Sequence, residues 1–186
     1  MRNERITVMR QASQLIYTRN MFWRLLKIRC LTIRNHNIEG IPTDQSLETM
    51  EGEQIMVCDY DGIYRGSYNF KIYNRVAKFF ETVVFNLVRR EYDYVDSLVS
   101  GASRVIVDSS ISDSVLEKIM EISPDVVMPY VSSERVEFFR SIGGYSFISS
   151  RQINGPFQIC YNVGTALGSE KYVDVIGFPE DLLHFL

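Results

Sequence analysis

The feature that most constrains the fold is the stretch from Ser103 to Ile148, which alternates short β-branched runs with amphipathic segments. Arg104–Val107 and Val126–Val131 are too short for helices and are bounded by polar or breaking residues, which predicts buried strands. Apolar residues recur at helical spacing after each run: Val115, Leu116 and Ile119, then Val136 and Phe139. The order strand, helix, strand, helix, strand predicts parallel strands joined by helical crossovers, with ligands at their carboxyl ends.

Bulk properties limit the class of protein. A chain of 186 residues with 46% hydrophobic and 23% charged residues is long enough for one globular domain, which we place at 1–186. The net charge of −3 gives no general attraction for nucleic acid. Three widely spaced cysteines without a CxxC pair suggest neither a zinc site nor a disulfide framework, so a reduced, cytoplasmic setting is expected. No apolar run reaches the roughly 20 residues of a membrane span.

The N-terminal half predicts strands, helices and one hairpin. Arg5–Arg10 fits a short strand or the start of a helix, and the apolar pattern from Ala12 to about Ile33 predicts an amphipathic helix. Asn35–Glu53 is polar and is expected to be a loop. Residues 54–73 predict two strands joined by a turn at Asp59-Tyr60-Asp61-Gly62, because an Asp-Gly pair is a strong turn former. Helical spacing then continues from Val76 to Val88, and Arg89-Arg90-Glu91 would end that helix.

The C-terminal part predicts a second hairpin. Pro156–Val163 alternates apolar with polar or small residues and would pair antiparallel with Tyr145–Ser150 through Asn154-Gly155. The tail from Tyr172 predicts a small apolar strand and a last turn of helix.

This order of elements resembles the GCN5-related N-acyltransferase (GNAT) superfamily. The last helix of that family is matched by Phe138-Phe139-Arg140-Ser141-Ile142-Gly143-Gly144-Tyr145. Three further pieces resemble its autoinducer-synthase and N-acyl amino acid synthase branch: Leu26-Lys27-Ile28-Arg29, Asp59-Tyr60-Asp61-Gly62 with Arg65-Gly66, and Ala102-Ser103-Arg104-Val105-Ile106-Val107-Asp108. The resemblance implies an α/β (α+β) fold: a mixed, mostly antiparallel sheet with a central parallel pair and helices on both faces.

The resemblance also implies a reaction, N-acyl transfer from acyl-CoA or acyl-carrier protein to the amine of a small acceptor. Neither donor would be bound permanently, and no metal is implied. Arg104 and Tyr130 would be catalytic, with Arg104 orienting an acceptor carboxylate or a donor phosphate. Arg29 and Trp23 would bind substrate, and arginines of the first helix would suit an acidic carrier protein. The donor would lie against Val107, Asp108, Ser109 and Ser110, where backbone N–H groups would hold the oxyanion.

Three departures from the family pattern favour an alternative. Gly101 stands where a glutamate is expected, Phe139 where a tyrosine often acts as general acid, and the turn Ser109–Ser112 has none of the glycines that face a pyrophosphate. Each departure removes a part that the chemistry would use. The alternative is a catalytically silent GNAT-like module that binds protein or has a structural role, for instance in a viral particle.

Individual residues also have plainer interpretations. Asp59-x-Asp61-Gly62 is similar to the haloacid-dehalogenase nucleophile motif, but two acids that decorate a turn are the favoured explanation. Arg104 could instead pair with Glu91 or Asp108. Tyr130 fits a buried tyrosine with a hydrogen-bonded hydroxyl. Ser109, Ser110 and Ser112 would then only cap a helix from Asp113.

Overall fold

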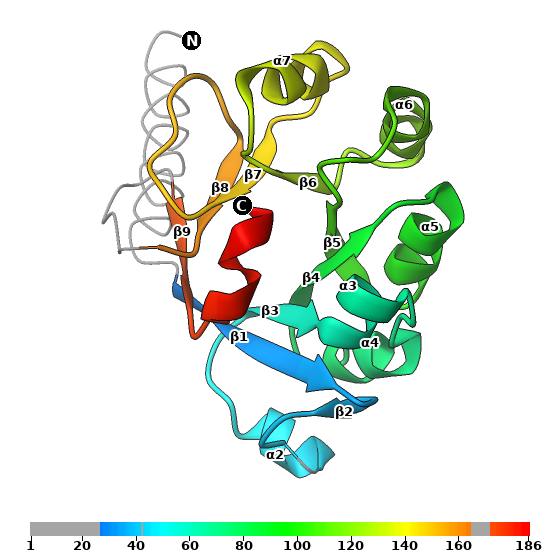
Figure 1. The fold of residues 1–186 in the computed structure, drawn as a ribbon. Helices are drawn as coiled ribbons and strands as arrows, with labels where there is room; N and C mark the ends of the chain where they lie inside the picture. The colour runs from blue at the N-terminus through cyan, green and yellow to red at the C-terminus, as the bar shows by residue number, and fades with distance from the viewer. Residues whose placement is uncertain (1–26, 42, 165–171) are drawn as a thin grey trace, which may run out of the picture.

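The computed structural model describes residues 27–41, 43–164 and 172–186. Eight strands pair in parallel, each with the next, and β1 also pairs with β9, so the sheet closes into a barrel (Figure 1). The barrel strands are β1 (Lys27–Arg34), β3 (Gln54–Asp59), β4 (Glu81–Val88), β5 (Ala102–Val107), β6 (Val126–Pro129), β7 (Ser146–Ser149), β8 (Ile159–Asn162) and β9 (Tyr172–Ile176). A two-residue strand, β2 (Asn37–Ile38), pairs antiparallel with β1.

Helices connect most of the strands around the outside of the barrel. They are α2 (Asp44–Glu48), α3 (Tyr60–Arg65), α4 (Phe70–Val76), α5 (Glu91–Val99), α6 (Asp113–Ile122) and α7 (Ser133–Ser141). The segment 150–158 between β7 and β8 has no helix, but its residues Ile153 and Phe157 pack against the outer core. The short 3-10 helix η2 (Glu180–Phe185) follows β9 and lies across the centre of the ring (Figure 1). The architecture is a small, partly reduced TIM-type barrel.

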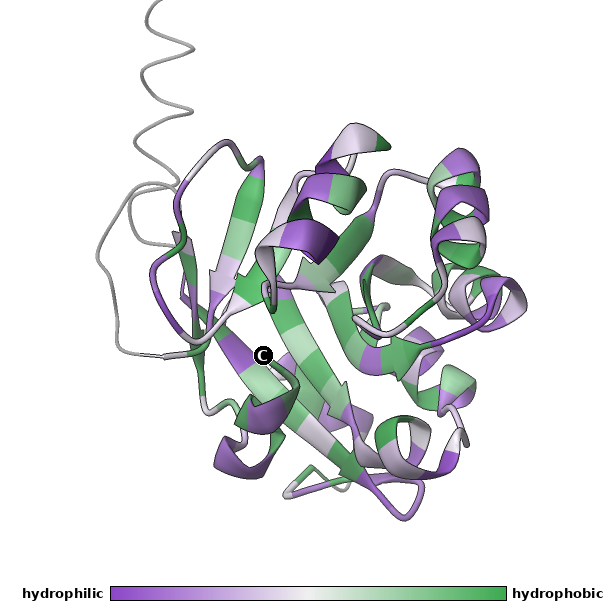
Figure 2. Cartoon of the chain, turned by 45° about the horizontal axis from the view of Figure 1, so that its top comes forward, coloured by the Kyte–Doolittle hydropathy of each residue, from purple (hydrophilic) through white to green (hydrophobic). Residues whose placement is uncertain are grey.

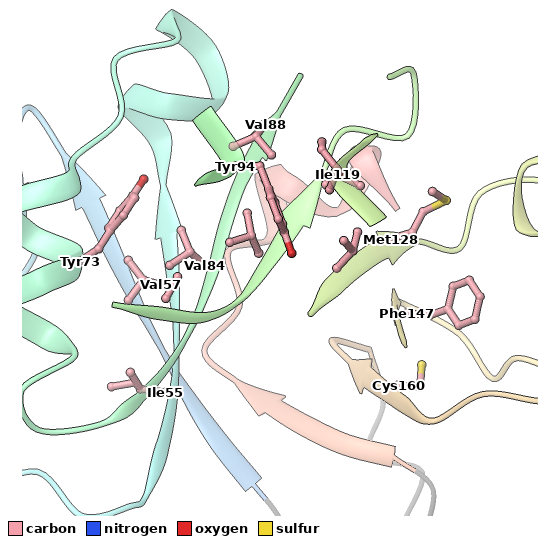
Figure 3. Close-up of a cluster of buried hydrophobic side chains, with 14 of the residues drawn as sticks. Ile55, Val57, Tyr73, Val84, Val88, Tyr94, Ile119, Met128, Phe147 and Cys160 are labelled. Atoms are coloured by element: carbon pink, nitrogen blue, oxygen red, sulfur yellow. The ribbon is translucent and has the colours of Figure 1, made fainter. Parts of the chain in front are cut away.

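The sheet separates two hydrophobic cores, and this explains the composition of its strands. Inside the barrel, Met56, Phe85, Ile106 and Tyr161 are buried together with residues of η2. Outside it, the alternate strand residues pack against the helices; Figure 3 shows part of this layer, including Val57, Val84, Met128 and Phe147. Because both faces are buried, the strands are mostly hydrophobic along their whole length (Figure 2).

The predicted GNAT-like, mostly antiparallel sheet is wrong, since every pairing among the eight barrel strands is parallel. The prediction of a parallel strand pair between Ser103 and Ile148 is confirmed. β5 and β6 pair in parallel through Val105–Val126 and Ile106–Val127, and the helices α6 and α7 follow them. A strand–helix–strand unit is common to both architectures, so it could not distinguish them.

The hairpin predicted for residues 54–73 is also wrong. Asp59 ends β3 and caps α3, because its Oδ1 accepts a hydrogen bond of 3.1 Å from the Gly62 backbone N–H. An aspartate three residues before a glycine N–H suits a helix start as well as a turn. The residues expected to form the second strand are therefore α3 and α4.

Two further predictions misassigned strands. The helix predicted from Val76 to Val88 is wrong because Glu81–Val88 forms β4, in which seven consecutive residues are buried and no alternation marks a strand. The second hairpin is wrong because β7 and β8 pair in parallel, from Ser146–Ile159 to Ser149–Asn162. The predicted strand at the tail is confirmed as β9, and the last turn of helix is η2.

The predictions at the N-terminus fall mostly outside the described residues. The strand proposed at Arg5–Arg10 and most of the helix from Ala12 lie there. The end of that helix is wrong, because Lys27–Arg34 forms β1. The loop expected at Asn35–Glu53 contains β2 and the short helix α2.

Candidate functional site

The carboxyl ends of the barrel strands are where enzymes of this architecture place their active sites. Here the centre of that end is filled by the C-terminal segment. Leu182 of η2 is fully buried in the interior core, and Leu183, Phe185 and Leu186 pack against it. Phe178 meets Phe85 of β4 edge-on, with ring centroids 5.2 Å apart. The mouth is therefore closed by apolar side chains, and open space lies around its rim.

Polar contacts hold η2 in this position. The Tyr60 hydroxyl donates a 2.5 Å hydrogen bond to Asp181, and Arg34 at the end of β1 lies 3.5 Å from the same carboxylate. The Arg34 guanidinium also stacks over the Tyr60 ring at 3.5 Å from its centroid. The Tyr60 hydrogen bond holds the pKa of Asp181 below its usual value, and burial raises the pKa of Tyr60. We call these contacts among Arg34, Tyr60 and Asp181 the Tyr60–Asp181 latch, and they join β1, α3 and η2.

Asp59 is the centre of a buried network at the end of β3. It has no exposed surface, and its carboxylate accepts hydrogen bonds from the Gly62 N–H at 3.1 Å, the Asn69 N–H at 3.0 Å and the Asn69 amide group at 2.7 Å. The Tyr73 hydroxyl also donates to it. Four donors to one buried carboxylate fix α3 and α4 against the barrel.

Asp61 extends this network to the loop after β1. Its carboxylate accepts from the Asn35 N–H at 3.1 Å and the His36 N–H at 2.8 Å, and from the Asn69 amide at 3.1 Å. Burial opposes ionisation of Asp61, but these hydrogen bonds outweigh it and lower the pKa. Both acids of the Asp59-x-Asp61 motif are therefore fully occupied in holding loops together.

A pocket of about 420 Å³ lies on the rim between α3 and the end of β4. We call it the arginine pocket, because three of its polar side chains are arginines; these polar side chains are Tyr64, Arg65, Tyr68, Arg89, Arg90 and Asp93. Arg65 comes from the last turn of α3, and Arg89 and Arg90 lie between β4 and α5. The lining thus carries three guanidinium groups against one carboxylate.

Arg89 is held in place by the next strand. Its Nε lies 2.7 Å from Asp108, the residue after β5, and Asp108 also accepts from the Ser110 N–H at 2.8 Å and its hydroxyl at 2.7 Å. Burial opposes the charge on Asp108, but the Ser110 hydrogen bonds and Arg89 outweigh it, so its pKa is lowered. A stable Asp108 anion keeps Arg89 at the pocket.

The backbone at the pocket is irregular. Leu87 has φ of 49°, a value that leucine rarely adopts, and it lines the pocket. The β4–β5 register shifts between Phe85 and Val88, as in a β-bulge. Bulges and strained residues occur often beside binding sites, where they redirect side chains. Here the bulge precedes Arg89 directly.

Asp93 and Tyr68 give the pocket two groups with shifted pKa values. Burial raises the pKa of Asp93, and Arg90 partly offsets this. Burial, with a contribution from Asp93, raises the pKa of Tyr68 to about 12. Tyr68 is therefore a hydrogen-bond donor at neutral pH.

Two other recesses lie on the same rim. One of about 310 Å³ beside the Tyr60–Asp181 latch shares Tyr64 and Arg65 with the arginine pocket. The other, about 650 Å³, lies at the starts of α6 and α7. Its charged side chains are mainly acidic, and Arg135 there is paired with Asp113 and the Ile111 carbonyl. Of these three recesses, the arginine pocket is thus the strongest candidate for an anion.

The residues predicted from sequence are spread around the barrel. Arg104 lies near the amino end of β5 and pairs with Glu81 at 3.0 Å, not with Glu91 or Asp108. Arg29 is exposed on β1. Trp23 lies outside the described residues.

The other predicted residues lie at the carboxyl ends. Val107 is buried at the end of β5, and Asp108, Ser109 and Ser110 follow it. Tyr130 follows β6 and meets Phe147 edge-on, at 5.5 Å between ring centroids. Ser112 is the N-cap residue of α6, although its side chain makes no capping hydrogen bond. The structure brings only Asp108 into contact with an arginine of the pocket.

Sequence reasoning missed Arg65, Arg89 and Arg90 as site residues. Arg89-Arg90 follows an apolar run directly, a signal that would have marked the end of a buried strand had β4 been recognised. Within the described residues, no group of three or more His, Cys, Asp or Glu side chains is arranged to hold a metal. No helix of this part of the chain has the length and apolarity to cross a bilayer.

Comparisons with known proteins bear on the fold. No protein-family model matches the sequence, and no curated protein matches it. The crystal structure of KGPDC from Streptococcus mutans is similar, with a TM-score of 0.58 and 12% identity, over 82% of this chain and 89% of that chain. The predicted membership of the GNAT superfamily and the N-acyltransferase activity inferred from it are therefore wrong. At this identity the likeness extends to the fold alone, a closed parallel barrel.

Proposed function

We propose that the protein binds a small phosphate ester in the arginine pocket. The observation that carries the proposal is the convergence of Arg65, Arg89 and Arg90 on one recess at the carboxyl end of the barrel. Guanidinium groups form charge-assisted, often bidentate hydrogen bonds with phosphate oxygens. Arg89 and Arg65 also pair with Asp108 at 2.7 Å and with Asp61 at 3.5 Å, so the proposal rests on the remaining guanidinium donors at the pocket and not on an excess of positive charge.

Size and backbone geometry support the same ligand class. A volume of about 420 Å³ lies in the range of small-molecule sites. Arg90 is the N-cap of α5 and makes no side-chain capping hydrogen bond. The N–H groups at the start of a helix favour an anion, whereas the acidic Glu91 and Asp93 in the first turn of α5 oppose one. The exposed ring of Tyr64 offers a surface for the uncharged part of the ligand, and Tyr68, which hydrogen-bonds to Asp93, completes the lining.

Calorimetric titration tests the proposal directly. Sugar phosphates and inorganic phosphate are titrated into the protein, with the matching unphosphorylated sugars as controls. We expect each ester to bind at least about tenfold more tightly than its sugar, because one charge-assisted hydrogen bond alone contributes about 1.5–3 kcal/mol. Equal affinity for the ester and the sugar, or no binding of any phosphate, would exclude this function.

Asp93 should weaken binding of the phosphate, and its removal should strengthen it. Because its pKa is raised, the carboxyl stays neutral to a higher pH than an ordinary aspartate, and above that pKa it repels the ligand. We expect Asp93→Asn to bind a phosphate ester about two- to threefold more tightly at pH 7, since a partly exposed charge pair contributes about 0.2–1 kcal/mol.

The comparison across pH separates this charge effect from a change of shape. Below the pKa of Asp93 both proteins present a neutral side chain, so their affinities should converge. Titrations of the two proteins at a series of pH values from 7 downward measure this. A gain that persists unchanged at the lower pH values would contradict the charge argument.

A further inference from the structure

Two of the three cysteines lie together inside the barrel. The Sγ atoms of Cys30 on β1 and Cys58 on β3 are 3.1 Å apart, although the residues are 28 positions apart in the sequence. Both side chains point to the interior core. Cys160, the third cysteine, is buried on the outer side of the sheet and has no cysteine nearby.

We propose that Cys30 and Cys58 form a reversible disulfide site, oxidised by low-molecular-weight disulfides such as oxidised glutathione. Bonded sulfurs are about 2.0 Å apart, so the bond requires the two atoms to approach by about 1 Å. Shifts of this size are within the reach of side-chain rotation on neighbouring strands. The β1–β3 pairing already holds the two chain segments side by side, through Cys30–Met56 and Thr32–Cys58.

The order of reaction follows from access. Cys30 is partly exposed, whereas Cys58 is fully buried. Burial, and then contact with Cys30, raises the pKa of the Cys58 thiol, and the Asp181 carboxylate of η2 adds to the shift. Cys30 is therefore the thiol that an external disulfide meets first.

The exchange proceeds in two balanced steps. The Cys30 thiolate attacks one sulfur of oxidised glutathione, a mixed disulfide forms, and one glutathione thiolate leaves. Cys58 then loses its proton and attacks the Cys30 sulfur, so that the Cys30–Cys58 bond forms and the second glutathione leaves. The protein gives up two electrons and two protons, and one oxidised glutathione becomes two reduced molecules.

The disulfide would join β1 and β3 beneath η2. These strands lead into the loops that Asp61 and Asp59 hold together, and the Tyr60–Asp181 latch spans the same elements. A covalent bond here restricts the unfolded chain far more than the folded barrel, where the two sulfurs are already in contact. Oxidation should therefore make the protein more stable.

The test uses the full-length protein incubated with oxidised glutathione, followed by digestion without reductant and mass spectrometry. We expect a peptide pair linked through Cys30 and Cys58, and a rise in Tm of about 5–15 °C that dithiothreitol reverses. Cys160→Ala should behave in the same way. Cys30→Ala and Cys58→Ala should form no internal disulfide.

Three results would overturn the proposal. The first is that the native protein gives no peptide pair linked through Cys30 and Cys58, although its cysteines react with oxidised glutathione once the protein is unfolded. Another is a glutathione adduct on Cys30 that accumulates without being displaced by Cys58. The third is an internal disulfide that includes Cys160. The linked peptide is detected in the wild-type protein, so the test remains valid even if a cysteine variant folds poorly.

Discussion

Asp59→Ala is expected to destabilise the protein by about 3–5 kcal/mol, the largest effect of a single substitution that we predict. The side chain is fully buried and accepts hydrogen bonds from Gly62, from the backbone and side chain of Asn69, and from Tyr73. Its removal leaves the Gly62 and Asn69 N–H groups and the Tyr73 hydroxyl without this acceptor in a buried place, and α3 and α4 lose this attachment to β3. Urea unfolding, with m as a check on two-state behaviour, measures the loss.

Two variants show whether the effect belongs to the network. Asp96→Ala removes an exposed aspartate from α5 and should change the free energy of unfolding by no more than about 0.5 kcal/mol. Tyr73→Phe removes one donor and keeps the carboxylate, so it should cost about 1 kcal/mol. If Asp59→Ala were no more destabilising than Asp96→Ala, the network would not hold the rim of the barrel together.

Arg89→Ala is expected to weaken phosphate-ester binding about 10- to 100-fold, because it removes a charge-assisted hydrogen bond donor from the arginine pocket. The folded state should lose at most about 1 kcal/mol. Arg89 is more than half exposed, and Asp108 keeps both hydrogen bonds from Ser110. Titration and urea unfolding of the same variant separate the two effects.

The matched control is Arg151→Ala. Arg151 is exposed just beyond the end of β7, on the same side of the barrel but outside the arginine pocket. It changes the net charge by the same amount, so it should preserve most of the affinity. An equal loss in both variants would mean that the ligand responds to the charge of the whole protein and not to the pocket.

The sequence predicted the local units of the fold better than their arrangement. The strands β5 and β6, the helices α6 and α7 and the parallel crossover between them follow from β-branched runs and helical periodicity. Barrel closure depends on pairing between β1 and β9, which are far apart in the chain and leave no local pattern. Strands buried on both faces, such as β4, also lack the alternation that would distinguish them from helices.

The candidate site was harder to predict than the fold. The similarity of Asp59-x-Asp61-Gly62 to a nucleophile motif was noted in the sequence, but its carboxylates accept hydrogen bonds from Asn35, His36 and Asn69, contacts that only the folded chain creates. Arg65 and Arg89 converge because α3 and the end of β4 are neighbours in the barrel. Because the residues of β4 were predicted to be helical, Arg89 was expected at a solvent-exposed helix end and not at the end of a barrel strand.

The most direct test of our account is a map of backbone amide shifts as a phosphate ester is titrated into isotopically labelled protein. A ligand in the arginine pocket lies on the rim, so the shifts should gather at residues 62–68 and 87–93 and be small in η2. Shifts centred on residues 180–185 and on the interior core, with the arginine pocket unaffected, would contradict it. They would mean that the ligand displaces η2 and occupies the mouth of the barrel.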